Sequence, residues 1–219
     1  MNLNKEGNDA EMTRIVGLTG GIGTGKSTAA GYLKARGFAH IDADEIGRQI
    51  TADGSDMLPV LDAVFGPEGE LGEKGRAILD ENGSLDRKTL ADIVFTDAKK
   101  KARLDEVMFR AITAEIDRQI ELLQKENDSG MRGILLDAPL LFEAGLDGRC
   151  DCVLVLVADE AVRIDRVCRR DGATAQEVRN RINSQMSDNE KIKKSDFVID
   201  NSEGLEELEE NLDEFLAAF

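Results

Sequence analysis

The sequence predicts an α/β fold, with a five-stranded parallel sheet flanked by helices and interrupted by a helical insertion. Three observations support this prediction. Short apolar segments alternate with stretches of helical propensity, these segments lack polar alternation, and one long stretch contains no convincing strand. Strands that are apolar throughout are typical of a parallel sheet covered on both faces. A chain of 219 residues is long enough to bury the core of one such domain.

Five short apolar segments qualify as buried strands, and each ends within two residues of glycine or aspartate. A continuous apolar run bounded by such turn-forming residues is typical of a core strand. Helical stretches separate the five segments, which gives the repeating strand–helix order of a parallel sheet. The predicted strands comprise residues 14–18, 38–41, 133–136, 152–157 and 197–199.

The spacing of these strands divides the chain into a core and two additions. Residues 45–130 form a stretch that is too long for a simple crossover, so we predict a mainly helical insertion there. Residues 1–12 are polar and aperiodic, which predicts a disordered arm before a single domain at 13–219. The predicted core comprises residues 13–44, 131–162 and 195–219, and residues 163–194 are the predicted lid.

Helical spacing of leucines also predicts a helix at the end of the chain. Leu205, Leu208 and Leu212 recur at positions that share one helix face. Ser202 precedes them and is the candidate N-cap.

Charge and hydropathy limit the partners of the chain. Asp and Glu outnumber Lys and Arg by 44 to 28, for a formal net charge of −16 at pH 7. Broad contact with nucleic-acid backbone needs a basic face, so we expect no nucleic-acid partner. No apolar run reaches the length of a membrane span, and residues 1–12 lack the apolar segment of a signal peptide. We therefore expect a cytoplasmic protein without a membrane partner, whose oligomeric state the sequence leaves unknown.

Residues 20–27, GGIGTGKS, match the phosphate-loop (P-loop) pattern G-x-x-x-x-G-K-[ST] in full, between a predicted strand and a predicted helix. Glycines let successive N–H groups point at phosphate oxygens, and the helix N-terminus adds further amides. In such a loop Lys26 reaches the β- and γ-phosphates and Ser27 offers its hydroxyl to Mg²⁺. The alternative is a glycine-rich turn that binds nothing, which the complete motif in its proper context disfavours. The candidate triphosphate-binding residues are Gly21, Gly23, Thr24, Gly25, Lys26, Ser27 and Thr28.

Other classes of P-loop protein fit less well. A GTP-binding switch should carry an Asn-Lys-x-Asp motif, and the sequence contains none. A motor or transporter ATPase usually has a longer chain and an acid directly after a long apolar strand. Asp137 partly matches that acid, so this class stays open.

An Asp-x-Asp pair, Asp42 and Asp44, follows the second predicted strand. Ligands of an open parallel sheet bind outside the carboxyl ends of its strands, so these carboxylates can face an acceptor beside the γ-phosphate. One of them could accept the proton of an attacking hydroxyl. Equally, Asp42 or Asp44 could serve only as the cap of the next helix.

Arginines are concentrated after the fourth predicted strand. Arg163, Arg166 and Arg170 share one face of a predicted helix, and Arg169 lies beside them. In so acidic a chain, such a cluster favours a lid that closes over phosphates. The alternative is a surface helix whose arginines pair with nearby acids. Those acids are Asp159, Glu160, Asp165 and Asp171.

Taken together, these residues resemble the dephospho-coenzyme A kinase family over nearly the whole chain. The order and spacing of the motifs are more specific than any single motif after the phosphate loop. The matching residues are GLTGGIGTGKST at 17–28, IDAD at 41–44, GSLDR at 83–87 with Leu90, VF at 94–95, PLLFE at 139–143, Arg166, RRDG at 169–172, RI at 181–182 with Gln185, and DFVIDN at 196–201.

The resemblance implies a P-loop kinase fold with a nucleotide-kinase-like core, a CoA-binding insertion at 45–130 and a mobile lid at 163–194. It implies ATP-dependent phosphorylation of the ribose 3′-hydroxyl of dephospho-CoA, the last step of coenzyme A biosynthesis. It also implies Asp44 as the base, Lys26 as the γ-phosphate contact and Arg166 as a lid arginine near the phosphates. ATP and Mg²⁺ are the expected cofactors, and dephospho-CoA is the expected small-molecule partner.

The chain departs from the family pattern at three places. Phe109 and Arg110 stand where the family usually has His-Pro, and Arg163 stands where it often has glutamine. The loop at 66–78 is also longer than usual. Because two of these departures lie in the insertion, one alternative is a kinase of another nucleotide or nucleoside. A further alternative is a non-catalytic ATP-binding module.

Overall fold

The computed structural model describes residues 13–95, 97–126 and 130–219, so the predicted arm at 1–12 lies outside the described residues. The chain divides into two compact units, one formed by residues 42–119 and the other by the rest of the described chain. The larger unit carries a five-stranded sheet with strand order β2-β3-β1-β4-β5. Its strands are β1 (Ile15–Gly20), β2 (Phe38–Asp42), β3 (Gly133–Asp137), β4 (Cys152–Val157) and β5 (Phe197–Asp200).

All five predicted strands are present, and the predicted α/β fold with a parallel sheet is confirmed. β1 lies at the centre and pairs in parallel with β3 and β4, and β4 pairs in parallel with β5. β1, β3 and nearly all of β4 are buried along their whole length, which explains their continuous apolar sequence.

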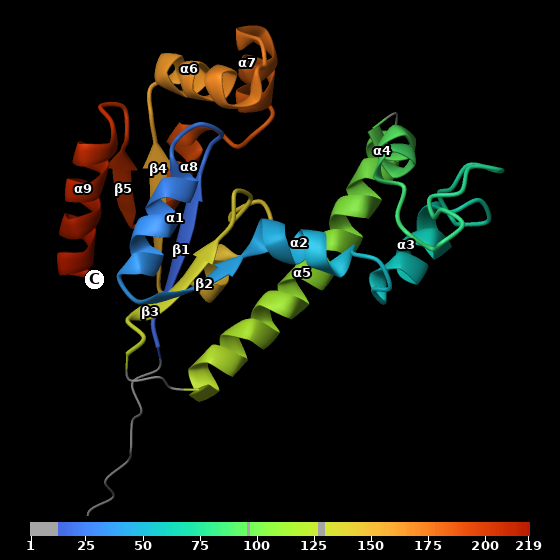
Figure 1. Ribbon diagram of the computed structural model, residues 1–219, viewed down its shortest axis with the longest axis horizontal. Coiled ribbons are helices and arrows are strands. Elements are labelled where there is room, and N and C mark those ends of the chain that lie inside the picture. Colours follow the sequence, from blue (N-terminus) through green and yellow to red (C-terminus); the bar gives the residue numbers. More distant parts are fainter. Residues whose placement is uncertain (1–12, 96, 127–129) are drawn as a thin grey trace, which may run out of the picture. The chain divides into compact units, whose positions relative to one another are not determined.

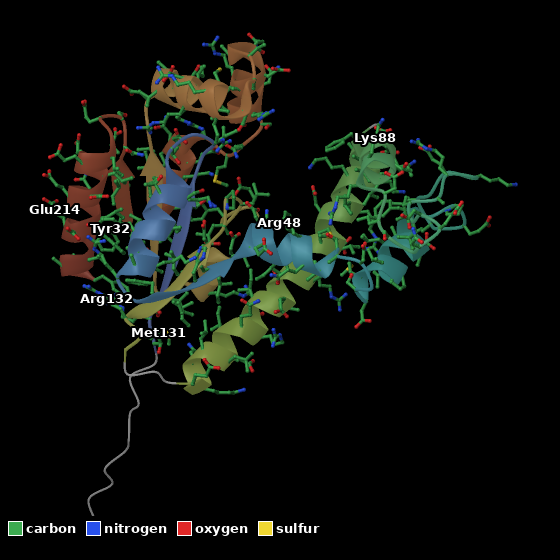
Figure 2. All side chains as sticks on the ribbon, in the orientation of Figure 1. Tyr32, Arg48, Lys88, Met131, Arg132 and Glu214 are labelled. Atoms are coloured by element: carbon green, nitrogen blue, oxygen red, sulfur yellow. The ribbon has the colours of Figure 1, made fainter. Side chains whose placement is uncertain are left out.

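Helices of the larger unit are α1 (Lys26–Ala35), α6 (Glu160–Asp171), α7 (Ala175–Asn183), α8 (Asp188–Lys194) and α9 (Leu205–Ala218), with a 3₁₀ turn, η1 (Asp147–Arg149). α1 and α9 pack together on one face of the sheet, where their leucines meet the apolar side chains of β1 and β4 (Figure 1). Glu214 lies on the outward face of α9 (Figure 2). α6 and α7 pack against each other beyond the ends of the strands, and α8 packs on β4.

The prediction that Ser202 caps the last helix is wrong. Gly204 occupies the N-cap position of α9, which begins at Leu205. The Ser202 hydroxyl instead accepts a hydrogen bond from the Asp159 N–H at 2.9 Å and donates one to the Asp200 carboxylate. Ser202 therefore ties the end of β5 to the start of α6.

The smaller unit is helical, as predicted for the insertion, although the exact domain boundaries stay a prediction. Its helices are α2 (Ala43–Ile50), α3 (Met57–Phe65), α4 (Arg87–Phe95) and most of α5 (Ala98–Glu126). Phe65, Ile78 and Ile93 are fully buried in its core. Ile78 comes from the loop at 66–78, so this loop contributes to the core. Just after this loop, Leu79 and Leu85 form an isolated antiparallel bridge.

α5 runs for 29 residues without interruption across Phe109 and Arg110. Proline in a helix interior removes a backbone N–H and clashes with the preceding turn. Arg110 keeps that N–H, so the helix continues where a His-Pro pair would interrupt its hydrogen bonds. Within the described parts of the chain, no helix is at once long enough and apolar enough to span a lipid bilayer.

Candidate active site

The phosphate loop turns sharply between β1 and α1. Gly25 is the N-cap of α1 and has a φ of 93°, a left-handed conformation that favours glycine. A Cβ atom at Gly25 would lie 2.2 Å from Nδ2 of Asn201, so the position also lacks room for a side chain. The hydroxyl of Thr24 donates to the carbonyl of Gly21 at 2.9 Å and closes the loop on itself. Local sequence thus dictates a tight loop whose last residue opens a helix.

Lys26, the first residue of α1, directs its ammonium group to the carboxylate of Asp137 at the end of β3. Asp137 is 3% exposed, and its other carboxylate oxygen lies 3.4 Å from Nε2 of His40. β3 is the neighbour of β1 in the sheet, which brings an acid at its carboxyl end next to the phosphate loop. The sequence signal for Asp137 was its position directly after an apolar strand.

Asn201 supports the loop from the end of β5. Its side-chain amide donates to the carbonyl of Thr24 at 2.8 Å, and the residue is 5% exposed. Its Oδ1 atom is buried and has no hydrogen-bond partner among the described residues. Sequence reasoning gave Asn201 no role because the contact joins residues that are 177 positions apart.

The arginine cluster does not form a single phosphate-facing surface. Arg169 pairs with Asp165 at 3.0 Å and Arg170 with Asp171 at 2.7 Å, both on the surface. For these two arginines, the alternative of surface pairing with nearby acids is therefore confirmed. Arg163 is 3% exposed and is bound inside the unit.

Arg166 differs from its neighbours on α6. It is half-buried, and its Nη1 atom is buried without a hydrogen-bond partner among the described residues. A buried guanidinium nitrogen without a partner is uncommon, because leaving such a donor unsatisfied is costly. Arg166 therefore has a donor available for an anion.

Lys191 is a further buried cation that sequence reasoning missed. Its side chain is fully buried in α8 and donates to the carbonyl of Pro139 at 3.3 Å. Burial lowers the pKa of Lys191. The carboxylates of Glu143 and Asp188 oppose this shift in the pKa, and the positive charges of Arg163 and Lys26 add to it. In sequence it resembles any other residue of a lysine-rich, solvated stretch, which is why no pattern identified it.

The two carboxylates of the Asp-x-Asp pair have separate roles. Asp42 is the N-cap of α2, and its side chain accepts hydrogen bonds from the N–H groups of Asp44 at 2.9 Å and Glu45 at 3.0 Å. The capping alternative is thus confirmed for Asp42. Asp44 lies in the first turn of α2 and lines a pocket within the smaller unit.

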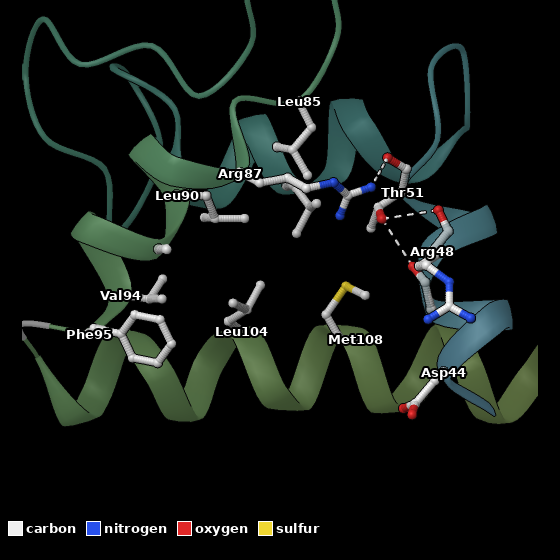
Figure 3. A pocket seen from close by; sticks show the side chains of 13 residues that line it. Asp44, Arg48, Thr51, Leu85, Arg87, Leu90, Val94, Phe95, Leu104 and Met108 are labelled. Atoms are coloured by element: carbon white, nitrogen blue, oxygen red, sulfur yellow. Dashed lines mark hydrogen bonds between the residues drawn. The ribbon is translucent and has the colours of Figure 1, made fainter. Parts of the chain in front are cut away.

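This pocket has a volume of about 400 Å³ and is mostly apolar (Figure 3). α4 and α5 supply its apolar walls, including Leu90, Leu104 and Met108. Arg48 and Arg87 lie at the end near α2, where Arg87 donates to the carbonyl of Thr51 at 3.2 Å. The pocket therefore suits a molecule with an apolar part and an anionic part.

Comparison with known proteins identifies the family of this chain. The family model for dephospho-CoA kinase matches residues 14–207. The chain belongs to the dephospho-CoA kinase family. A dephospho-CoA kinase from Corynebacterium glutamicum is 39% identical over 202 residues, which are 92% of this chain and 97% of that protein. One from Fusobacterium nucleatum subsp. nucleatum is 37% identical over 201 residues, 92% of this chain and 96% of that protein.

Solved structures agree with this assignment to the dephospho-CoA kinase family. Dephospho-CoA kinase from Campylobacter jejuni has a TM-score of 0.62 and 26% identity, covering 94% of this chain and 97% of that chain. TT1252 from Thermus thermophilus has a TM-score of 0.75 and 31% identity, covering 95% and 99%. Shikimate kinase from Bacteroides thetaiotaomicron, at 12% identity and a TM-score of 0.51 over 94% of this chain and 98% of that chain, shares the fold. The P-loop kinase fold predicted from the sequence is thereby confirmed.

Proposed function

We propose that this chain transfers the γ-phosphoryl group of ATP to the ribose 3′-hydroxyl of dephospho-CoA, giving CoA and ADP. Family membership supports this reaction, and the single structural observation that carries it is the complete phosphate loop with Lys26 at the start of α1. A helix N-terminus that follows a glycine-rich loop binds phosphate through backbone amides and the helix dipole. The last step of coenzyme A biosynthesis is then the cellular role, in the cytoplasm.

The residues of the loop region fit Mg²⁺. Ser27 is exposed in the first turn of α1, and the Asp137 carboxylate lies against the neighbouring Lys26. Hydroxyl and carboxylate oxygens are the hard donors that Mg²⁺ prefers. When bound, the ion supplies positive charge that offsets the negative charge of the β- and γ-phosphates. Ser27 and Asp137 would hold it.

Phosphoryl transfer requires mainly alignment and charge neutralisation. Lys26 contacts the γ-phosphate, and Arg166 uses its unpartnered nitrogen on the phosphate oxygens. Asp44 accepts the proton of the 3′-hydroxyl while the hydroxyl oxygen forms its bond to the γ-phosphorus. The bond between that phosphorus and the β–γ bridging oxygen breaks, and ADP leaves.

The pocket of the smaller unit supports dephospho-CoA as the acceptor. Its apolar walls from α4 and α5 suit the pantetheine arm, and Arg48 and Arg87 suit the diphosphate. Because Asp44 lines the same pocket, a bound acceptor would lie against the proposed base. A kinase of another nucleotide would need no such apolar volume.

A coupled assay of ADP release tests the proposal. We expect turnover with dephospho-CoA and little with nucleoside monophosphates, and turnover with the latter alone would indicate the other kinase class. Asp44→Asn should lower kcat by roughly 10²- to 10⁴-fold, the usual contribution of a general base, while ATP binding is retained. Asp42→Asn is the matched control, because asparagine caps a helix about as well as aspartate. Wild-type kcat in Asp44→Asn would contradict the role of Asp44 as the base, whereas a wild-type chain that binds ATP but shows no turnover with any acceptor would indicate a non-catalytic ATP-binding module.

A further inference from the structure

We propose that Arg163 and Gln185 are positioning residues that hold the two peptide groups flanking Ile22 in the phosphate loop and so set the loop's affinity for ATP. This inference rests on the proposed function, because it takes ATP as the ligand of the loop. Neither residue contacts the reacting atoms in this proposal. Both act through the main chain of Ile22.

Ile22 lies in the middle of the loop, and both of its main-chain polar groups are bound by side chains from distant segments. Its N–H donates to Oε1 of Gln185 at 2.9 Å. Its carbonyl accepts from Nε of Arg163 at 2.8 Å. These partners are 163 and 141 residues away in sequence. A loop that bound ATP through local geometry alone would not need either contact.

The glycines on both sides of Ile22 let the Arg163 residue approach the loop. A Cβ atom at Gly21 would lie 2.3 Å from Nη2 of Arg163, and one at Gly23 would lie 2.8 Å from the Arg163 carbonyl oxygen. Such distances leave no room for a side chain. Gly21 and Gly23 therefore serve two purposes, since they free amides for phosphate and seat α6 against the back of the loop.

Arg163 is itself fixed. Its Nη1 atom pairs with the Asp188 carboxylate at 2.7 Å, and its side chain is only 4% exposed. Asp188 opens α8, so the guanidinium joins α6, α8 and the loop. Buried charge-assisted hydrogen bonds of this kind are shorter and stronger than neutral ones, which makes the attachment rigid.

The Ile22 N–H belongs to the peptide group that joins Gly21 to Ile22, and the Ile22 carbonyl belongs to the one that joins Ile22 to Gly23, so the two contacts prevent both of these peptides from flipping. In a phosphate loop, the direction of each N–H depends on the orientation of its neighbouring peptides. Without the two contacts the loop would sample orientations that bind phosphate poorly, and the competent fraction would fall. ATP affinity falls by the same fraction. Acceptor affinity should not change, because the acceptor pocket belongs to the smaller unit.

The experiment compares four variants of the full chain by calorimetric titration with ATP, thermal melting and steady-state kinetics. Arg163→Met and Gln185→Met each remove one contact to Ile22. Asp188→Asn keeps the contact from Arg163 to Ile22 but removes its charged partner. Arg169→Met is the control on the same helix, since the Arg169 side chain is 80% exposed.

We expect Arg163→Met and Gln185→Met to raise the Kd of ATP roughly 5- to 100-fold, which corresponds to losing a hydrogen bond that positions the loop. The KM for dephospho-CoA should stay at the wild-type value. Asp188→Asn should lower the Tm with a smaller change in ATP affinity, and Arg169→Met should change neither. Gln185→Met leaves no buried charge behind, so it should fold even if Arg163→Met does not.

A purely stabilising role gives a different pattern. If the variants melt at lower temperature but bind ATP with the wild-type Kd, the positioning role is refuted. An equal rise in the KM values of ATP and dephospho-CoA would refute it as well. If the wild-type chain itself fails to bind ATP, the proposed function fails. This result differs from failure of the positioning role, because the variants are compared only with a wild-type chain that binds ATP.

Discussion

The ammonium group of Lys26 pairs with the carboxylate of Asp137, so the first residue of α1 is joined to the last residue of β3. Both side chains are largely shielded, with exposures of 15% and 5%. The pair pre-positions the lysine at the carboxyl ends of the central strands, where ligands of open parallel sheets bind.

Lys26 is the one charged side chain in the phosphate loop, residues 20–27. Lys26→Met should lower kcat by roughly 10²- to 10³-fold, since it removes charge stabilisation in the transition state. Lys34→Met is the matched control, because Lys34 is exposed in the last turn of the same helix. Steady-state kinetics measures both variants. Equal kcat values for the two would show that Lys26 does not act on the transferred phosphoryl group.

Replacing Gly25 and Gly31, at the start and in the interior of α1, by alanine should change the stability of the fold in opposite directions. Gly25→Ala places a side chain at a φ of 93° and against Asn201, which should cost about 1–3 kcal/mol of stability and weaken ATP binding. Gly31→Ala adds a Cβ with nothing within 4 Å in a helix interior, which should stabilise the fold by about 0.5–1 kcal/mol. Chemical denaturation measures both changes. A Gly25→Ala protein as stable as Gly31→Ala would contradict the strained geometry of the loop.

The apolar pocket gives a prediction about the acceptor alone. Met108→Trp fills space beside Leu104 and Leu90 and should raise the KM for dephospho-CoA at least roughly tenfold, a loss of about 1.4 kcal/mol. The KM for ATP should not change. Ala102→Trp on the exposed side of α5 is the control for a bulky aromatic residue on this helix. If Met108→Trp leaves the acceptor KM unchanged, dephospho-CoA does not occupy this pocket.

Local patterns account for what the sequence could predict. A buried parallel strand and a phosphate loop are each encoded within a few consecutive residues, so β1, α1 and the conformation of Gly25 follow from residue types alone. The choice between capping and catalysis for Asp42 and Asp44 could not be made, because either aspartate can cap a helix. Backbone geometry at Asp42 settles which of them does.

Tertiary contacts account for the features that the sequence could not predict. Arg163 belongs to a run of arginines that looks uniform in sequence, yet it is buried while Arg169 is exposed. The difference arises because α6 turns Arg163 toward Ile22 and Asp188, which are 141 and 25 residues away. Lys191 is hidden by the same kind of context, since its neighbours in sequence are exposed lysines.

The uninterrupted helix α5 gives a last prediction, which concerns the replacement of His-Pro by Phe109 and Arg110. Arg110 lies well inside the helix and is exposed, so its side chain contributes little, while its backbone N–H continues the helix. Arg110→Pro should therefore lower the free energy of unfolding by about 3 kcal/mol, through the lost hydrogen bond and the clash with the preceding turn. Arg110→Ala separates the backbone effect from the side chain and should be nearly neutral. Urea denaturation of both proteins provides the measurement. A stable Arg110→Pro protein would show that α5 tolerates a kink at this point. The replacement of His-Pro by Phe109 and Arg110 would then have no effect on stability through the continuity of the helix.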